Sequence, residues 1–153
     1  VGVGGGWKSM KSNSRLSLAL HALSHMARES DRYWTSAEIA EHAGTNPVVV
    51  RRALGKLAKA GFLLAKKGHS GGWRLACDPN DISLADIYLA LEEGVFAASQ
   101  PVEPTKCSLE TALHEKVAGV LTDIEGVLIA RLGETSIAEI TGHATAQSGP
   151  ARP

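Results

Sequence analysis

The chain has 153 residues, 44% of them hydrophobic, which is enough for one domain or for a small head with an oligomerisation arm. No apolar run could span a bilayer, no start resembles a signal peptide, and two distant cysteines make a disulfide framework unexpected, so we expect a cytoplasmic protein with no membrane partner. The net charge of zero hides a basic half, residues 1–75 with 12 Lys and Arg against 4 Asp and Glu, and an acidic half, residues 76–153 with 4 against 12.

The first residues, 1–10, are rich in glycine and are expected to form a flexible extension. A helix is predicted from Arg15 to about Arg28, with leucines on one side. His21 and His25 are four residues apart, so both imidazoles lie on one helical face, where they could bind a metal. No carboxylate or thiol nearby in the sequence completes such a site, so we expect polar packing residues and no metal.

Two capped helices are predicted next. Thr35 and Glu38 have the spacing of a capping box, and Gly44 favours the left-handed conformation that ends helices. Asn46 followed by Pro47 then starts a second helix, with asparagine as N-cap and proline at the first helical position. A short glycine-containing turn between two helices is typical of a helix-turn-helix.

The second of these helices has two unlike faces. At about 100° per residue, its valine, alanine and leucine positions form one side, whereas Arg52 and Lys59 lie on the opposite side with Arg51 and Lys56 flanking them. A solvated helix face is the ordinary alternative, but such faces usually mix charges, and no acidic residue occurs between positions 47 and 61. The pattern therefore favours DNA contact.

A basic hairpin follows, with short apolar strands expected at 62–65 and 73–76 around a glycine-rich turn. Such a tip can lie along phosphates or enter the minor groove, and its glycines would let the backbone approach the duplex. Residues 11–80 are thus predicted to be a winged helix-turn-helix DNA-binding domain. The predicted contacts with double-stranded DNA are Thr45, Asn46, Pro47, Val48, Arg51, Arg52, Lys56 and Lys59, and in the wing Lys66, Lys67, His69, Ser70, Gly71 and Gly72.

Residues 81–143 are predicted to be a linker helix and a dimerisation region. Ser83 and Asp86 cap a fourth helix that should end at Gly94, and residues 95–106 are expected to be a loop. A long helix then runs over residues 109–132, with apolar side chains recurring every three and four residues. Such a seam could cover its own domain, but it also suits a homodimer with two heads. Residues 144–153 should form a flexible tail.

This order of elements resembles the Rrf2 family of bacterial winged-helix transcription regulators. The segments NPVVVRR, GHSGGWRL and ISLADIYLALEE carry the resemblance, which covers residues from about Lys11 to His143. It implies homodimers that bind operators of imperfect dyad symmetry through the second motif helix and the wing. The family includes iron-sulfur regulators, nitric-oxide-sensing repressors and a regulator of cysteine metabolism.

The cysteines depart from the pattern of the cluster-binding members. Those members carry three closely grouped cysteines before the long helix, whereas this chain has only Cys107 there and Cys77 near the wing. We therefore expect the cluster-less branch of the family and no cofactor. Cys107 lies between Lys106 and a predicted N-cap at Ser108, which favours a reactive thiolate that senses oxidants or electrophiles. The alternative is a small half-buried residue at a helix start.

The expected fold is mainly α with a small β-hairpin wing, a winged helix-turn-helix head and a long dimerisation helix. The expected function is a sequence-specific transcription regulator, a homodimeric repressor of a near-palindromic operator. No phosphate loop, nucleophile elbow or metal motif indicates an enzyme. The competing interpretation is a winged helix that binds proteins, for which the cluster of basic residues would have no purpose.

Overall fold

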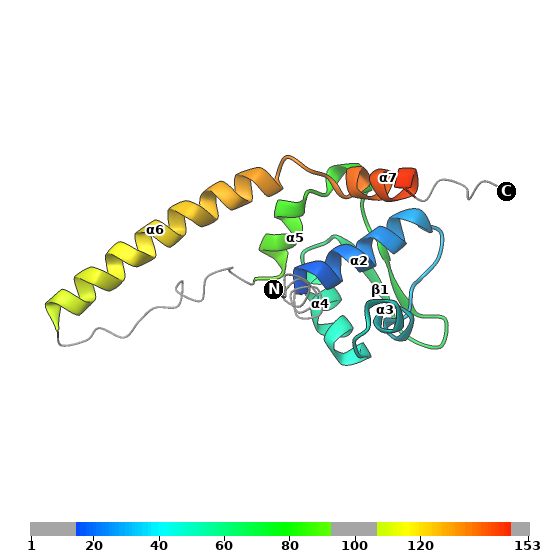
Figure 1. Ribbon diagram of the computed structural model, residues 1–153. Coiled ribbons are helices and arrows are strands. Elements are labelled where there is room, and N and C mark those ends of the chain that lie inside the picture. Colours follow the sequence, from blue (N-terminus) through cyan, green and yellow to red (C-terminus); the bar gives the residue numbers. More distant parts are fainter. Residues whose placement is uncertain (1–14, 93–106, 148–153) are drawn as a thin grey trace, which may run out of the picture.

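The computed structural model describes residues 15–92 and 107–147. Its elements, shown in Figure 1, confirm a mainly helical fold with one small antiparallel hairpin. The expected extension at 1–10 and the expected loop at 95–106 lie outside the described residues. In chain order the elements are α2 (Arg15–Arg28), α3 (Ser36–Ala43), α4 (Pro47–Lys59), β1 (Leu63–Lys66), β2 (Gly72–Leu75), the short 3-10 helix η1 (Pro79–Asp81), α5 (Leu84–Ala90), α6 (Ser108–Leu132) and α7 (Ile137–Gln147).

The head has one apolar core, to which α2, α3 and α4 each contribute a buried face. Leu23 and Met26 of α2, Ile39 of α3, and Leu54 and Leu57 of α4 are all fully buried. Burying a side chain of this size stabilises the fold by roughly 1.5–3 kcal/mol. These contacts hold α3 and α4 against a common support, which is what a helix needs in order to present its other face in a fixed orientation.

The core of the head extends past residue 80, where the sequence placed its boundary. Ile82, Ile87 and Leu91 belong to it, and so does Ile137, the first residue of α7. The backbone N–H of Ile137 donates to the carbonyl of Ile82 at 2.9 Å, and α7 lies over α2 in Figure 1. The segments on both sides of the long helix therefore contribute to the core of the head.

In the second half of the chain, the end of α5 and the presence of α7 differ from the sequence predictions. The fourth helix, α5, ends at Ala90 rather than at Gly94, and Glu92 then takes a positive φ of 54°. The final helix α7 was not predicted, and it includes residues 144–147, which were expected to begin a flexible tail. Ser136 and Glu139 form a reciprocal pair of capping hydrogen bonds before it, at 3.1 and 3.2 Å, so the spacing that identified other helix starts is present here too.

The predicted caps of the two motif helices are confirmed. Thr35 and Glu38 make a complete capping box, and Gly44 ends α3 in the left-handed conformation with φ 67°. The side-chain Oδ1 of Asn46 accepts from the backbone N–H groups of Val48 at 3.0 Å and Val49 at 3.1 Å, and Pro47 follows at the first helical position. The end of α3 and the start of α4 are thus fixed by capping interactions that the sequence displays.

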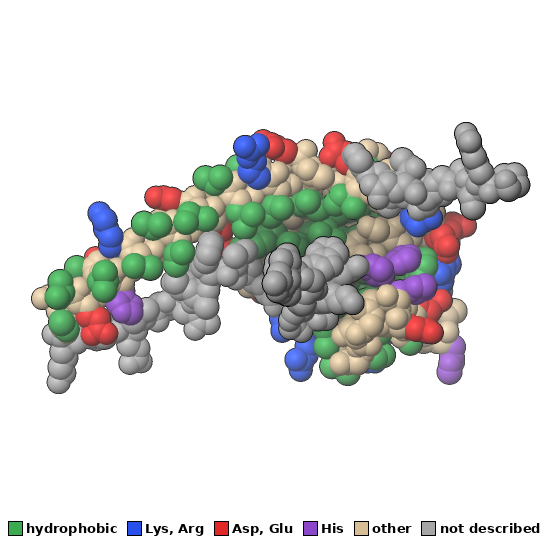
Figure 2. Space-filling model, viewed as in Figure 1, with side chains coloured by type: hydrophobic (Ala, Val, Ile, Leu, Met, Phe, Trp, Pro, Cys, Tyr) green, Lys and Arg blue, Asp and Glu red, His purple; other side chains and the backbone are tan. Residues whose placement is uncertain are grey.

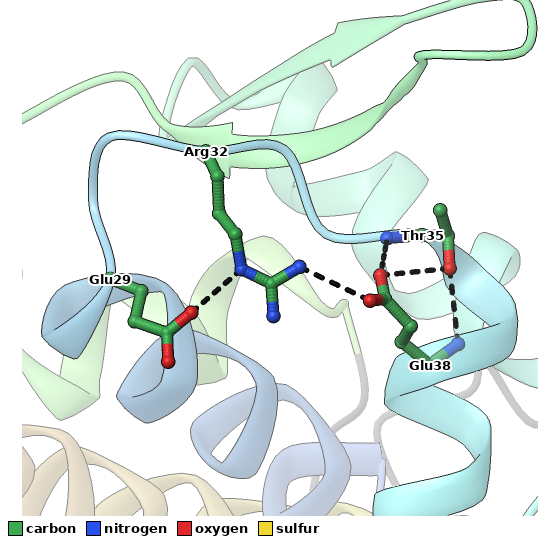
Figure 3. Close-up of polar contacts among 4 residues, drawn as sticks. All are labelled: Glu29, Arg32, Thr35 and Glu38. Carbon is green, nitrogen blue, oxygen red and sulfur yellow. Dashed lines mark hydrogen bonds and ion pairs between the residues drawn. The ribbon is translucent and has the colours of Figure 1, made fainter.

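A polar clamp fixes the loop that enters α3 (Figure 3). The Arg32 guanidinium donates to Glu29 at 2.7 Å and to Glu38 at 3.1 Å, and it lies 3.6 Å from the centre of the Trp34 ring. The hydrogen bond from the Thr35 backbone N–H, followed by those from Arg32 and the Thr35 hydroxyl, lowers the pKa of Glu38. The N-terminus of α3 is therefore tied to the end of α2 by one charged side chain.

The hairpin pairs Leu63 with Leu75 at its base and Lys66 with Gly72 at its tip, so β1 begins one residue later than predicted and β2 one residue earlier. Trp34 extends it, because Trp34 and Trp73 exchange two backbone hydrogen bonds of 2.8 Å. Gly72 lies against this bridge with a φ of 145°, and a Cβ there would overlap the backbone carbonyl of Trp34. The wing is thereby anchored to the residue that precedes α3.

Replacing Gly72 with alanine should lower the free energy of unfolding by about 2–4 kcal/mol, because strain at positive φ adds to the overlap with Trp34. Urea unfolding monitored by circular dichroism measures the loss. Gly68→Ala is the matched control, since Gly68 has a φ of 101° but open space around its Cβ position. A loss no larger for Gly72→Ala than for Gly68→Ala would show that the bridge does not restrict this position.

The long helix α6 stands apart from the head and projects away from it in Figure 1. The hydroxyl of Tyr88 on α5 donates to Glu125 at 2.6 Å, which joins the two elements. None of the α6 side chains is buried. Among the described helices, none combines the length and apolar character needed to cross a membrane.

Candidate nucleic-acid interface

The two faces predicted for α4 are confirmed by burial. Val50, Ala53, Leu54 and Leu57 are 0% exposed, while the basic side chains on the other side face solvent. Val48 lies on the same outer face, where 55% of it is exposed. The exposed basic residues of α4 are Arg51, Arg52 and Lys59.

This surface can hold polyanions. Arginine offers a planar fork of donors to phosphate oxygens or to the O6 and N7 atoms of guanine, whereas lysine acts as a point charge. The first turn of α4 carries no acidic residue, so nothing there opposes a phosphate near the positive end of the helix. Thr45 and Pro47 beside this turn are half-buried, and Asn46 is exposed with its Oδ1 engaged as the cap.

Lys56 is placed differently from the other basic residues of α4. It is half-buried, and its ammonium donates to the backbone carbonyl of Leu91 at 2.9 Å, directly after the end of α5. Cations commonly satisfy carbonyls left unpaired at a helix C-terminus. DNA contact by Lys56 stays a prediction, but this geometry disfavours it, because the ammonium already links α4 to α5.

The tip of the wing carries Lys66, Lys67, His69 and Ser70, all exposed. The Lys66 ammonium lies 5.5 Å from the centre of the Tyr33 ring. The tip therefore presents two lysines and a histidine on a loop joined to the head by β1 and β2.

Arg74 and Tyr33 also lie near the wing, and the sequence analysis did not include them among the predicted contacts. The guanidinium of Arg74 on β2 lies 5.5 Å from the Tyr33 ring, at the same distance as the Lys66 ammonium. Strand alternation offered a signal, because Arg74 lies between the apolar residues Trp73 and Leu75 and so points to the other face of the strand. Tyr33 had no such signal, since its place beside the wing depends on the bridge between Trp34 and Trp73.

The fold itself gives Gly71 and Gly72 a reason for being glycine. Gly71 is buried, and a Cβ there would overlap the carbonyl of Lys66, while a Cβ on Gly72 would overlap the carbonyl of Trp34. The turn therefore requires glycine at position 71, and the bridge with Trp34 requires it at position 72. The predicted approach of this backbone to DNA stays a prediction.

The cysteines do not suit an iron-sulfur cluster, which needs several thiolates. The sequence has two cysteines, and no group of three His, Cys, Asp or Glu side chains within 15–92 and 107–147 converges on a metal position. The Cys77 thiol donates to the carbonyl of Gly61 at 3.5 Å. Cys107 is exposed and is itself the N-cap of α6, without a capping side-chain hydrogen bond, so the expected N-cap at Ser108 was wrong.

Comparison with known proteins gives a consistent result. The family model Rrf2, described as an iron-dependent transcriptional regulator, matches residues 12–143. The chain is 34% identical over 134 residues to the protein named HTH-type transcriptional regulator YwnA of Bacillus subtilis strain 168, covering 86% of this chain and 97% of that one.

Solved structures share the fold over most of the chain. A crystal structure described as a DNA-binding protein aligns with a TM-score of 0.65 at 28% identity, covering 83% of this chain and 98% of its own. A Lactobacillus plantarum protein described as a transcriptional regulator aligns with a TM-score of 0.70 at 23% identity, covering 86% of this chain and 89% of its own. The second likeness bears on the fold alone.

Proposed function

Because the chain belongs to the Rrf2 family of DNA-binding transcription regulators, we propose that it is a homodimeric repressor that reads a near-palindromic operator. The observation that carries this proposal is the outer face of α4, on which Arg51, Arg52 and Lys59 are exposed with no acidic residue among them. We assign base reading to this face and phosphate contact to the wing lysines. The members of this family are transcription regulators and not enzymes, so we assign the chain no catalytic activity.

We propose a homodimer because a stripe of apolar side chains on α6 is exposed. Large apolar side chains rarely gather along one exposed helix without a partner. Figure 2 shows hydrophobic side chains along much of the visible surface of this helix. The stripe comprises Leu109, Leu113, Val117, Val120, Ile124 and Val127, which are 77, 62, 48, 52, 48 and 64% exposed.

A second copy of the chain is the occupant that these features favour. The stripe recurs at three and four residues over a 25-residue helix, which is the repeat of a helix-helix seam. A two-fold symmetric pair of such helices would place two heads on one duplex, and the acidic half of the chain would lie away from the phosphates. The head is held to this arm partly through Tyr88 and Glu125.

Salt-dependent binding to duplex DNA tests the proposal against the alternative of a protein-binding winged helix. The affinity for DNA should fall steeply with salt, with a log–log slope of roughly −0.9 for each phosphate neutralised. Fluorescence anisotropy with a labelled duplex measures it, and genomic fragments retained by the purified protein provide the specific site. Binding that is weak at low salt and insensitive to salt would favour the protein-binding module.

We also propose that Cys107 senses oxidants or electrophiles, because its exposed thiol sits where α6 begins. In the peroxide reaction the thiolate takes one oxygen to become a sulfenic acid, and the other oxygen leaves as hydroxide. Oxidation should weaken operator binding by the wild-type protein and leave Cys107→Ser unaffected, as measured by anisotropy before and after peroxide. Cys77→Ser is the control and should respond like the wild type; equal responses in all three proteins would remove the proposal.

A further inference from the structure

A cluster of histidines joins α2 to α3 on the head. His21 and His25 project from successive turns of α2, and their Nε2 atoms are 3.1 Å apart. The ring centre of His42, near the end of α3, lies 4.9 Å from the ring centre of His25. Figure 2 shows histidine side chains gathered on this face of the head, with Lys or Arg side chains beside them and others at the lower edge of the head.

The separation of the two Nε2 atoms is informative about what could lie between them. Imidazole nitrogens bind late first-row metals at about 2.0–2.1 Å, so two of them on one ion, at angles of 90–110°, are roughly 2.9–3.4 Å apart. The observed 3.1 Å lies within this range. The same distance also fits a hydrogen bond between two neutral imidazoles, so an experiment must separate the two arrangements.

The donor atoms of this cluster indicate which metals it would bind. His21, His25 and His42 offer only ring nitrogens. The nearby carboxylate of Glu29 is engaged by Arg32 at 2.7 Å. An all-nitrogen set suits Zn²⁺, Ni²⁺ or Cu²⁺ rather than Mg²⁺ or Ca²⁺.

We propose that His21 and His25 bind a divalent late first-row transition metal, and that His42 becomes the third ligand when its exposed side chain rotates. In the described residues the three side chains do not converge on one point, so His42 would have to rotate to become the third ligand. The ion would then join α2 to α3, the helix that supports α4. The site lies on α2 and α3 and includes neither cysteine and no basic residue of α4.

Calorimetric titration of the full chain with Zn²⁺ alone tests this site. We expect one saturable ion per chain, and His21→Gln or His25→Gln should weaken binding at least about tenfold, the loss that even an outer partner of a ligand causes. His42→Gln should weaken it as well, and less than the other two if water replaces the imidazole. Glutamine keeps each side chain polar, and circular dichroism checks that the variants fold.

His69→Gln and His114→Gln are matched controls, because both residues are exposed and lie on the wing and on α6. Both variants should keep the full zinc affinity. A second measurement on the wild-type protein avoids any effect of mutation: Ni²⁺ should broaden the ring proton signals of His21 and His25 before those of His69 and His114. No saturable zinc binding, equal affinity in the double variant H21Q/H25Q, or uniform broadening would show that the pair is only a hydrogen bond.

Discussion

Replacing Arg52 with alanine should weaken binding to the selected operator by about 1–3 kcal/mol, or roughly 5- to 150-fold, if its guanidinium reads a base. Arg52 lies on the exposed face of α4, while the opposite face of the helix is buried against the core. Truncation therefore removes donors without disturbing packing. Anisotropy titrations with the operator and with a scrambled duplex measure the change, which should be larger for the operator.

Arg131→Ala is the matched control for Arg52→Ala, because it removes the same charge from an exposed position on α6. It should leave affinity for both duplexes near the wild-type value. Lys67→Ala should instead weaken binding to both duplexes alike, as expected for a phosphate contact. If Arg52→Ala also weakened both duplexes equally, α4 would contribute charge and no base recognition.

Placing an aspartate at Ile124 should separate the dimer into monomers and remove most of the operator affinity. Ile124 is 48% exposed in the stripe of α6, and in a symmetric dimer two carboxylates would be buried without partners. The cost should be on the order of 3 kcal/mol or more, a hundredfold or greater rise in the dimer dissociation constant. Analytical ultracentrifugation measures it directly.

Thr122→Asp is the control for Ile124→Asp, since it adds the same charge on the opposite side of the helix, where Thr122 is exposed. It should remain dimeric. Circular dichroism should show both variants folded, because α6 buries no side chain of its own in the head. An Ile124→Asp protein that sediments as a dimer would place the subunit interface elsewhere.

The parts of the fold that depend on neighbouring residues could be predicted from the sequence. Thr35 with Glu38 and Ser83 with Asp86 form the capping boxes that their spacing indicates. The burial of one face of α4 follows from its periodicity, and the basic residues of the other face are visible in the same pattern.

The remaining features depend on contacts between distant segments. Lys56 looks like its basic neighbours in the sequence, and only the end of α5, 35 residues later, supplies the carbonyl that engages it. Gly72 could be assigned to a turn, but its closeness to Trp34 arises from a bridge across 39 residues. The position of α7 also depends on a distant segment, because its first residue, Ile137, belongs to the core and bonds to the backbone of Ile82.

Footprinting on the genomic fragment that the purified protein binds most tightly tests the central claim most directly. A dimer that reads DNA with two α4 helices should protect two related half-sites, with centres about 10–10.5 base pairs apart or a multiple of that spacing. The wild-type protein should protect both halves at the same concentration, and Arg52→Ala should lose both together. A single protected half-site, or protection without any shared sequence among the selected fragments, would contradict this account.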